Sequence, residues 1–191
     1  MQTFPIKWCI RGEMYLLAAT AILILPLKWI VAWILAIAVH EYSHYAVLRM
    51  FGVRVYAITV GFSGTIMETE SMNMCEETVC ALAGPLGGLS LLLLARWMPH
   101  VAICALFQSL YNLLPIYPLD GGRALMGLLS ICFLKKVAVK IYKIIKISIF
   151  TIFLSLSLAS LYYKFGFLPM VFTVSLFLKS RKENTLANAT N

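Results

Sequence analysis

The sequence predicts an all-α integral membrane protein with six transmembrane helices and a small β-hairpin between the second and the third. Of its 191 residues 61% are apolar, and only 16 Lys and Arg and 8 Asp and Glu are present. Soluble domains have about 45–50% apolar and about 25% charged residues. The apolar residues form long windows without charge, and basic residues flank these windows. We therefore expect residues 1–191 to form a single membrane domain.

The expected spans lie near residues 12–27, 29–49, 78–96, 97–119, 147–163 and 164–179. The first and last apolar windows are short, so their charged ends must snorkel. With six spans, thirteen of the 16 basic residues share one side, whereas without the two short spans the division is even. The positive-inside rule thus favours six spans with both termini in the cytoplasm. The first apolar run has no convincing cleavage site and is interpreted as a retained helix.

Two connections between the spans have patterns of their own. Residues 53–69 are β-branched and aromatic around the turn Gly61-Phe62-Ser63-Gly64, which predicts the β-hairpin. Lys136, Lys140 and Lys143 repeat at helical spacing, which indicates an interfacial helix against anionic lipid.

The net charge and the cysteine spacing argue against nucleic-acid binding and against disulfide or CxxC chemistry. The net charge of +8 arises from basic residues scattered between apolar segments, so it indicates membrane topology and no nucleic acid. The five cysteines include no CxxC pair and are expected to be reduced and structural.

The strongest motif is His40-Glu41-Tyr42-Ser43-His44, an HExxH within the second span. Residues i and i+4 lie on one face of a helix, so both imidazoles can bind one zinc ion. Glu41 is rotated aside, where it can act as a general base on water. Ionisable side chains in a membrane helix are costly and are usually retained for function.

A catalytic zinc needs a third protein ligand, for which His100, the loop acids and Asp120 are candidates. Asp120 follows two prolines at the end of the fourth span, at a depth similar to that of His44, and we favour it over His100. Two other classes of function stay open for the same His, Glu and Asp cluster. One is a membrane metal transporter, and the other is an inactive scaffold that binds membrane clients.

These residues resemble the site-2 protease family of intramembrane zinc metalloproteases, and within it the sporulation-type branch. The resemblance rests on the HExxH, the glycine-bearing hairpin, Ala83-Gly84-Pro85-Leu86-Gly87 and the pattern Asn112…Asp120-Gly121. It implies that His40, His44 and Asp120 bind one Zn²⁺ ion and that Glu41 is the catalytic base. It also implies that Asn112 holds the substrate backbone or supports the oxyanion, while a role in bridging helices alone stays open for this residue. Gly84 and Gly87 are interpreted as helix-packing residues without a chemical role.

The resemblance further implies a bacterial cell-membrane enzyme that cleaves a membrane-embedded or membrane-tethered protein near the cytoplasmic face. A sigma-factor precursor or an anti-sigma factor is the expected substrate class, and a regulatory membrane protein is a possible partner. The hairpin residues Gly61, Phe62, Ser63 and Gly64 are expected to bind substrate by strand addition. Because the sequence ends soon after Leu178, the soluble nucleotide-binding domain of that branch is not expected. The sequence predicts no oligomeric state.

Overall fold

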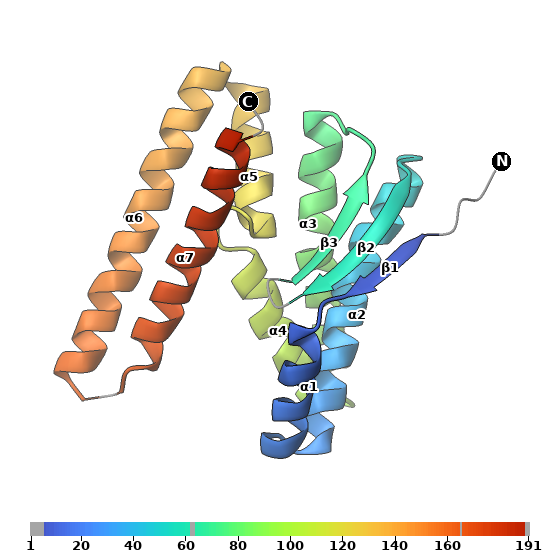
Figure 1. The fold of residues 1–191 in the computed structure, drawn as a ribbon, viewed down its shortest axis with the longest axis vertical. Coiled ribbons are helices and arrows are strands. Elements are labelled where there is room, and N and C mark those ends of the chain that lie inside the picture. Colours follow the sequence, from blue (N-terminus) through green and yellow to red (C-terminus); the bar gives the residue numbers. More distant parts are fainter. Residues whose placement is uncertain (1–5, 62–63, 165, 190–191) are drawn as a thin grey trace. The chain divides into compact units, whose positions relative to one another are not determined.

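The computed structural model describes residues 6–61, 64–164 and 166–189 (Figure 1). The helices are α1 (Glu13–Ile24), α2 (Leu27–Met50), α3 (Met74–Ser90), α4 (Pro99–Asn112), α5 (Asp120–Cys132), α6 (Lys135–Tyr162) and α7 (Leu168–Ala189). A short 3-10 helix, η1 (Leu91–Leu94), continues α3, and the strands are β1 (Lys7–Ile10), β2 (Val55–Gly61) and β3 (Gly64–Thr69). The chain forms two compact units, Met1–Leu113 and Leu114–Asn191.

Three helical segments of the described residues are long and apolar enough to cross a membrane: Leu27–Met50, Met74–Leu94 and Lys135–Tyr162. Two further apolar helices, Glu13–Ile24 and Pro169–Leu178, are shorter. The structure therefore supports a mostly helical membrane protein, while the six predicted spans are not confirmed.

The segment predicted as the fourth span, 97–119, is helical only in α4, which ends at Asn112. Pro115 and Pro118 cannot donate a backbone hydrogen bond, and proline also disfavours helical backbone in the residue before it. Residues 113–119 are accordingly turns, and α5 begins at Asp120. Helix α5 was not predicted from the sequence, because its three glycines and short length resemble a loop.

The predicted hairpin is present, and a third strand extends it. Strands β2 and β3 pair antiparallel, with Gly61 opposite Gly64. Gly64 has φ of 112°, which favours glycine. Phe62 and Ser63 lie outside the described residues. Strand β1 pairs parallel with β2, giving the order β1-β2-β3 (Figure 1). The mostly helical class with a small hairpin is thus confirmed, and β1 is an addition: it has four exposed residues and no alternation, so periodicity could not reveal it.

In the first unit, α2 buries one residue in every four. The buried residues are Ala32, Ala36, His40, His44 and Leu48. Ala32 and Ala36 pack with Val101, Cys104 and Ala105 of α4. Helix α3 packs against both α2 and α4. The last turn of α2 is closed by Gly52, whose positive φ of 73° suits the residue that follows a helix end.

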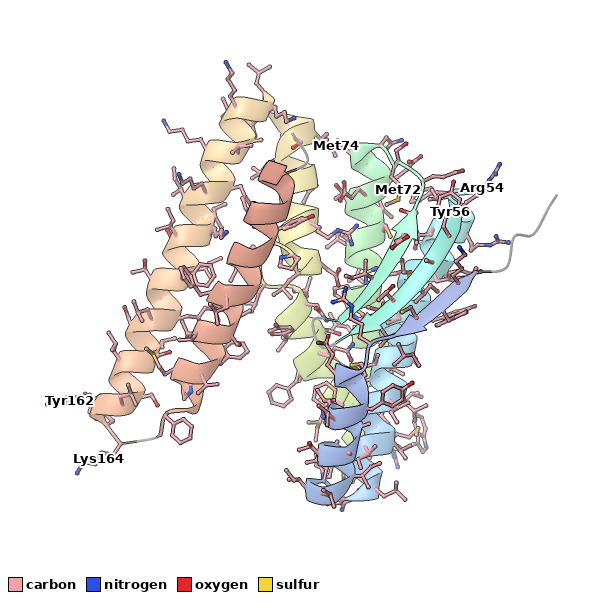
Figure 2. All side chains as sticks on the ribbon, viewed as in Figure 1. Arg54, Tyr56, Met72, Met74, Tyr162 and Lys164 are labelled. Carbon is pink, nitrogen blue, oxygen red and sulfur yellow. The ribbon has the colours of Figure 1, made fainter. Side chains whose placement is uncertain are left out.

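Four acidic residues follow or end the hairpin, and the contacts of Glu76 and Glu70 show how this segment is held. Glu76 and Asn73 form a reciprocal capping box at the start of α3. Glu70 accepts a hydrogen bond of 2.9 Å from the Tyr56 hydroxyl and lies 3.5 Å from Arg54. Figure 2 shows Arg54 and Tyr56 side by side at one end of the sheet. This segment is therefore consistent with a solvated loop that joins the sheet to α3.

In the second unit, α6 and α7 pack against each other, and α5 packs against α6. Helix α6 is continuous from Lys135 to Tyr162, so the predicted interfacial helix is the first part of a longer helix. Ser157 of α6 is 1% exposed, and its hydroxyl lies 2.8 Å from that of Thr173 in α7.

Candidate metal centre and active site

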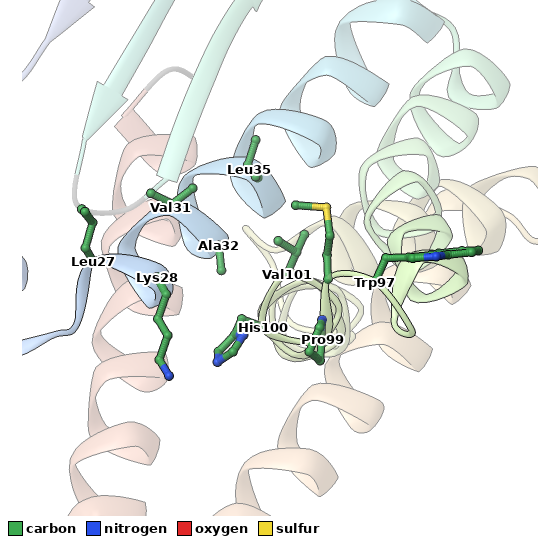
Figure 3. A pocket seen from close by; sticks show the side chains of 10 residues that line it. Leu27, Lys28, Val31, Ala32, Leu35, Trp97, Pro99, His100 and Val101 are labelled. Atoms are coloured by element: carbon green, nitrogen blue, oxygen red, sulfur yellow. The ribbon is translucent and has the colours of Figure 1, made fainter.

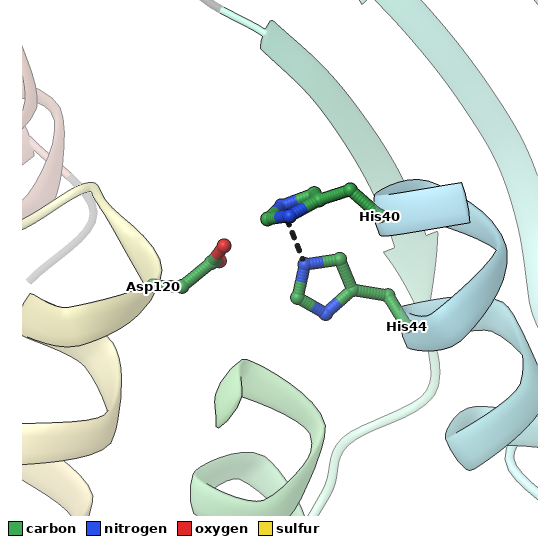
Figure 4. Close-up of side chains that lie close together, drawn as sticks. All are labelled: His40, His44 and Asp120. Atoms are coloured by element: carbon green, nitrogen blue, oxygen red, sulfur yellow. Dashed lines mark hydrogen bonds between the residues drawn. The ribbon is translucent and has the colours of Figure 1, made fainter. Parts of the chain in front are cut away.

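The two histidines of the HExxH lie one helical turn apart on the buried face of α2. His40 is 3% exposed and His44 is 8% exposed. Their Nε2 atoms approach to 3.3 Å (Figure 4). Two nitrogens bound at 2.0–2.1 Å to one tetrahedral zinc ion would lie about 3.3–3.4 Å apart. The two imidazoles therefore have the separation that a shared zinc ion requires.

A backbone carbonyl orients the His44 ring. The Nδ1 atom of His44 lies 2.8 Å from the carbonyl oxygen of Cys80 in α3. Since a carbonyl only accepts, Nδ1 is the protonated nitrogen and donates this hydrogen bond. The neutral ring then carries its lone pair on Nε2, which faces His40. A hydrogen bond of this kind is the usual way in which proteins fix the tautomer of a histidine metal ligand.

Gly84 makes this hydrogen bond sterically possible. A side chain on a helix covers the turn before its own Cα, so a side chain at position 84 would cover the Cys80 carbonyl. A Cβ placed on Gly84 would collide with Nε2 of His44 and would lie 2.5 Å from its Cε1. Gly84 thus allows the close helix approach that the sequence predicted, and the side chain it approaches is His44 of the metal cluster. The sequence signal was a glycine within the Ala83–Gly87 motif, but only coordinates reveal which side chain it faces.

Asp120 opens α5 and is half-buried. One ligand atom each from His40, His44 and Asp120 lie within 4.8 Å of one another, the only such group of three His, Cys, Asp or Glu among the described residues (Figure 4). Two imidazoles and a carboxylate form a donor set typical of catalytic zinc, which retains an open fourth position. The cluster therefore fits a metal site.

The remaining predicted residues lie on the same elements as expected. Glu41 follows His40 in α2 and is half-buried, and Asn112 is the last residue of α4 and is also half-buried. Tyr42 is 68% exposed, and the Ser43 hydroxyl donates to the carbonyl of Val39 at 2.7 Å. Gly61 and Gly64 close the hairpin.

His100, which sequence reasoning left open as a ligand, has a different environment. Its ring packs edge-on against Trp29, with centroids 4.7 Å apart. It lines an apolar cavity of about 460 Å³ together with Lys28 and Trp97 (Figure 3). This cavity contains none of the predicted site residues, and His100 is not part of the metal cluster.

Two known proteins are similar to this sequence. The chain is 31% identical over 140 residues to stage IV sporulation protein FB of Bacillus subtilis, covering 65% of this chain and 48% of that protein. It is 27% identical over 170 residues to zinc metalloprotease MJ0392 of Methanocaldococcus jannaschii, covering 78% and 48%. The chain thus spans about half the length of these relatives. No family model matches the sequence.

The fold is similar to that of a solved structure, the site-2 protease from Methanocaldococcus jannaschii. The TM-score is 0.64 at 20% sequence identity, and the match covers 96% of this chain and 94% of the other. Together, the two sequence similarities and the shared fold support the site-2 protease family.

Proposed function

We propose that this protein is a zinc-dependent endopeptidase that cleaves a membrane-embedded or membrane-tethered protein. The observation that carries the proposal is the geometry of the histidine pair. The two Nε2 atoms lie 3.3 Å apart, and the Cys80 carbonyl orients the His44 ring. A histidine pair held only for helix packing would not require a fixed tautomer with both Nε2 atoms facing each other.

His40, His44 and Asp120 would hold one zinc ion. When bound, zinc supplies a Lewis acid that polarises a carbonyl group and lowers the pKa of water. Glu41 is adjacent in sequence to His40 but points off the ligand face, because successive helix residues are rotated by about 100°. Glu41 therefore serves as the base: its carboxylate takes the proton from the attacking water and delivers it to the departing amide nitrogen.

Asn112 and the sheet would hold the substrate. A segment that unwinds in a membrane loses its helical hydrogen bonds, and each unsatisfied backbone group is costly there. The amide of Asn112 can both donate to and accept from such a backbone. An extended segment can also add to the outer edge of the sheet near Gly61–Gly64. The hairpin and the carboxamide would thereby offset the cost of unwinding.

The expected setting is a bacterial membrane that the chain crosses several times, with both termini in the cytoplasm. A membrane-tethered sigma-factor precursor or an anti-sigma factor is the first substrate class to test, and a second membrane protein would regulate cleavage. These proposals draw on the sporulation-type resemblance and on the distribution of basic residues.

The variant Glu41→Gln tests the proposed chemistry, because it removes the base while retaining the shape of the side chain. We expect purified Glu41→Gln protein to contain the same amount of zinc and to cleave a co-expressed single-span substrate at least about 100-fold more slowly. Tyr42→Phe is the matched control, since Tyr42 is adjacent and mostly exposed, and it should cleave normally. Chelation of zinc should abolish cleavage by the unaltered protein.

Other outcomes would indicate the rival functions. Zinc flux across vesicles that changes in Glu41→Gln, without any cleavage, would contradict the proposal and indicate a transporter. Stable binding of clients with no product in either form would indicate an inactive scaffold.

A further inference from the structure

Gln108 of α4 carries a buried oxygen that the proposed chemistry does not use. Its side-chain Oε1 is buried and has no hydrogen-bond partner within the described part of the chain. In a membrane protein an unsatisfied polar atom is expensive, because no bulk water is present to replace the missing partner. Such a group is usually retained for a ligand or another functional contact. Gln108 therefore needs an explanation beyond packing.

Gln108 lies on the inward face of α4, on the same side as Asn112. The two residues are four positions apart, so they are neighbours on one helical face. The buried residues Val101 and Ala105 continue this face toward the start of α4, and they pack against α2. The opposite face is exposed at Ile103 (42%), Phe107 (63%) and Leu110 (53%). Two carboxamides thus follow each other along the face that meets α2.

The contacts of α3 fix the depth of Gln108 relative to the histidines. Gly87 contacts Ser43 of α2, and the adjacent Gly88 contacts Ser109 of α4, so Ser43 and Ser109 are level. Helix α3 runs antiparallel to both neighbours, because Gly84 meets His44 and Gly88 meets Ser109, whereas Leu91, just after α3, packs against the cluster of Ala32 and Ala36 from α2 and Val101, Cys104 and Ala105 from α4. Helices α2 and α4 are therefore parallel.

This register places Gln108 at the depth of the metal ligands. At a rise of about 1.5 Å per residue, Gln108 is roughly 3 Å along the axis from His40 and roughly 3 Å from His44. Asn112 is roughly 3 Å beyond His44 by the same rise. The carboxamide of Gln108 is thus level with the histidine pair, and that of Asn112 follows one turn later.

The spacing of the two carboxamides matches an extended peptide. Residues i and i+4 of a helix are about 6 Å apart along the axis, and equivalent backbone groups of an extended chain repeat every 6.4–6.8 Å or so. Each carboxamide offers both a donor and an acceptor, as a peptide group does. We propose that Gln108 binds the substrate backbone two residues from the peptide group bound by Asn112. The two carboxamides of α4 would then hold two successive equivalent peptide groups of an unwound segment. This inference rests on the proposed function.

The test measures binding, so that it does not depend on cleavage. The full chain carrying Glu41→Gln is titrated in micelles with a fluorescent single-span peptide of Leu and Ala interrupted by Gly-Pro. The same peptide without Gly-Pro is the comparison. We expect the interrupted peptide to bind more tightly, and Gln108→Leu to weaken its binding about 10-fold. Binding of the uninterrupted peptide and the zinc content should not change.

Ser109→Ala is the matched control. Ser109 adjoins Gln108, is fully buried and likewise has no hydrogen-bond partner for its hydroxyl among the described residues, but it faces Gly88. Ser109→Ala should leave peptide binding unchanged. Equal binding by Gln108→Leu and Ser109→Ala would overturn the proposal, as would failure of the interrupted peptide to bind at all.

Failure of the proposed function gives a different pattern. The chain with Glu41 intact could bind the interrupted peptide through Gln108 and yet never produce a cleaved product with zinc present. That result would support peptide binding by Gln108 and contradict the endopeptidase function.

Discussion

Two buried polar side chains, Ser157 in the second unit and Gln108 in the first, differ in their hydrogen-bond partners. In the α6–α7 pair, the Ser157 hydroxyl contacts Thr173 Oγ1 at 2.8 Å and the carbonyl oxygens of Phe153 and Pro169 at 2.7 and 3.0 Å. Thr173 in turn donates to Pro169 at 2.9 Å. Among α2, α3 and α4, by contrast, two imidazole nitrogens face each other and the Gln108 oxygen has no partner within the described residues.

The difference separates polar groups used for packing from polar groups available to a ligand. A closed network satisfies its members and stabilises one helix pair. A group with remaining hydrogen-bonding or coordinating capacity is a candidate for ligand binding where, as for Gln108 beside Asn112, another candidate binding residue lies on the same helical face. A buried polar side chain in an apolar helix can thus serve either helix packing or ligand binding, and its hydrogen-bond partners distinguish the two roles.

The largest effect is expected on zinc affinity when a side chain is added at Gly84. Gly84→Ala would force the His44 ring away from the Cys80 carbonyl, because the new Cβ collides with that ring. We expect zinc affinity to fall about 10- to 100-fold, measured as zinc retained by purified protein against graded chelator. Gly87→Ala is the control: it crowds the same helix pair at Ser43 instead, so it should lower stability and retain zinc. Equal zinc loss in both variants would show that general packing, not the His44 contact, matters.

A smaller effect is expected in the closed network. Ser157→Ala removes the central hydroxyl between α6 and α7, while Thr173 keeps its bond to Pro169. Interhelical hydrogen bonds in membranes contribute about 0.6 kcal/mol on average, so the free energy of unfolding in micelles should fall by roughly that amount with zinc affinity unchanged. Ser155→Ala, which removes only an exposed bond within α6 to Thr151, should have less effect. A loss of zinc in Ser157→Ala would contradict the expectation that the Ser157–Thr173 network serves helix packing alone.

The smallest effect is expected at the exposed ion pair of the sheet. Arg54 lies 3.5 Å from Glu70, with side chains 73% and 40% exposed. Surface pairs of this kind contribute about 0–1 kcal/mol, so Arg54→Ala should change the free energy of unfolding by no more than about 0.5 kcal/mol, and less at high salt. A larger loss would mean that the sheet depends on this pair for its attachment to α2.

Much of the site could be predicted because its signals are local. The HExxH spacing fixes both histidines on one helical face regardless of the rest of the fold, and Gly61 and Gly64 predict the hairpin turn. Asp120 was predictable from the prolines that end α4 and from the expected direction of the spans. The sequence could also rank Asp120 above His100, whose ring packs against Trp29.

The remaining features depend on contacts between distant residues. Nothing local to Gly84 indicates that it faces His44, and nothing local to Gln108 indicates an oxygen without a partner. The parallel strand β1 was missed because its pairing with β2 spans two helices. Helix α5 was missed because Asp120-Gly121-Gly122 resembles a turn, although the structure uses it as a helix start.

The pairing of β1 with β2 has a consequence for the order of folding. Lys7 pairs with Ala57, and closing a loop of roughly fifty residues costs more entropy than closing the β2–β3 turn. Parallel neighbours also require a crossover, which here consists of α1 and α2. During synthesis the hairpin can therefore form as soon as it emerges, whereas the first strand can pair with β2 only after α1 and α2, which lie between the two strands in the chain, have been made. Completion of the sheet would thus report that α2, which carries His40 and His44, has already formed.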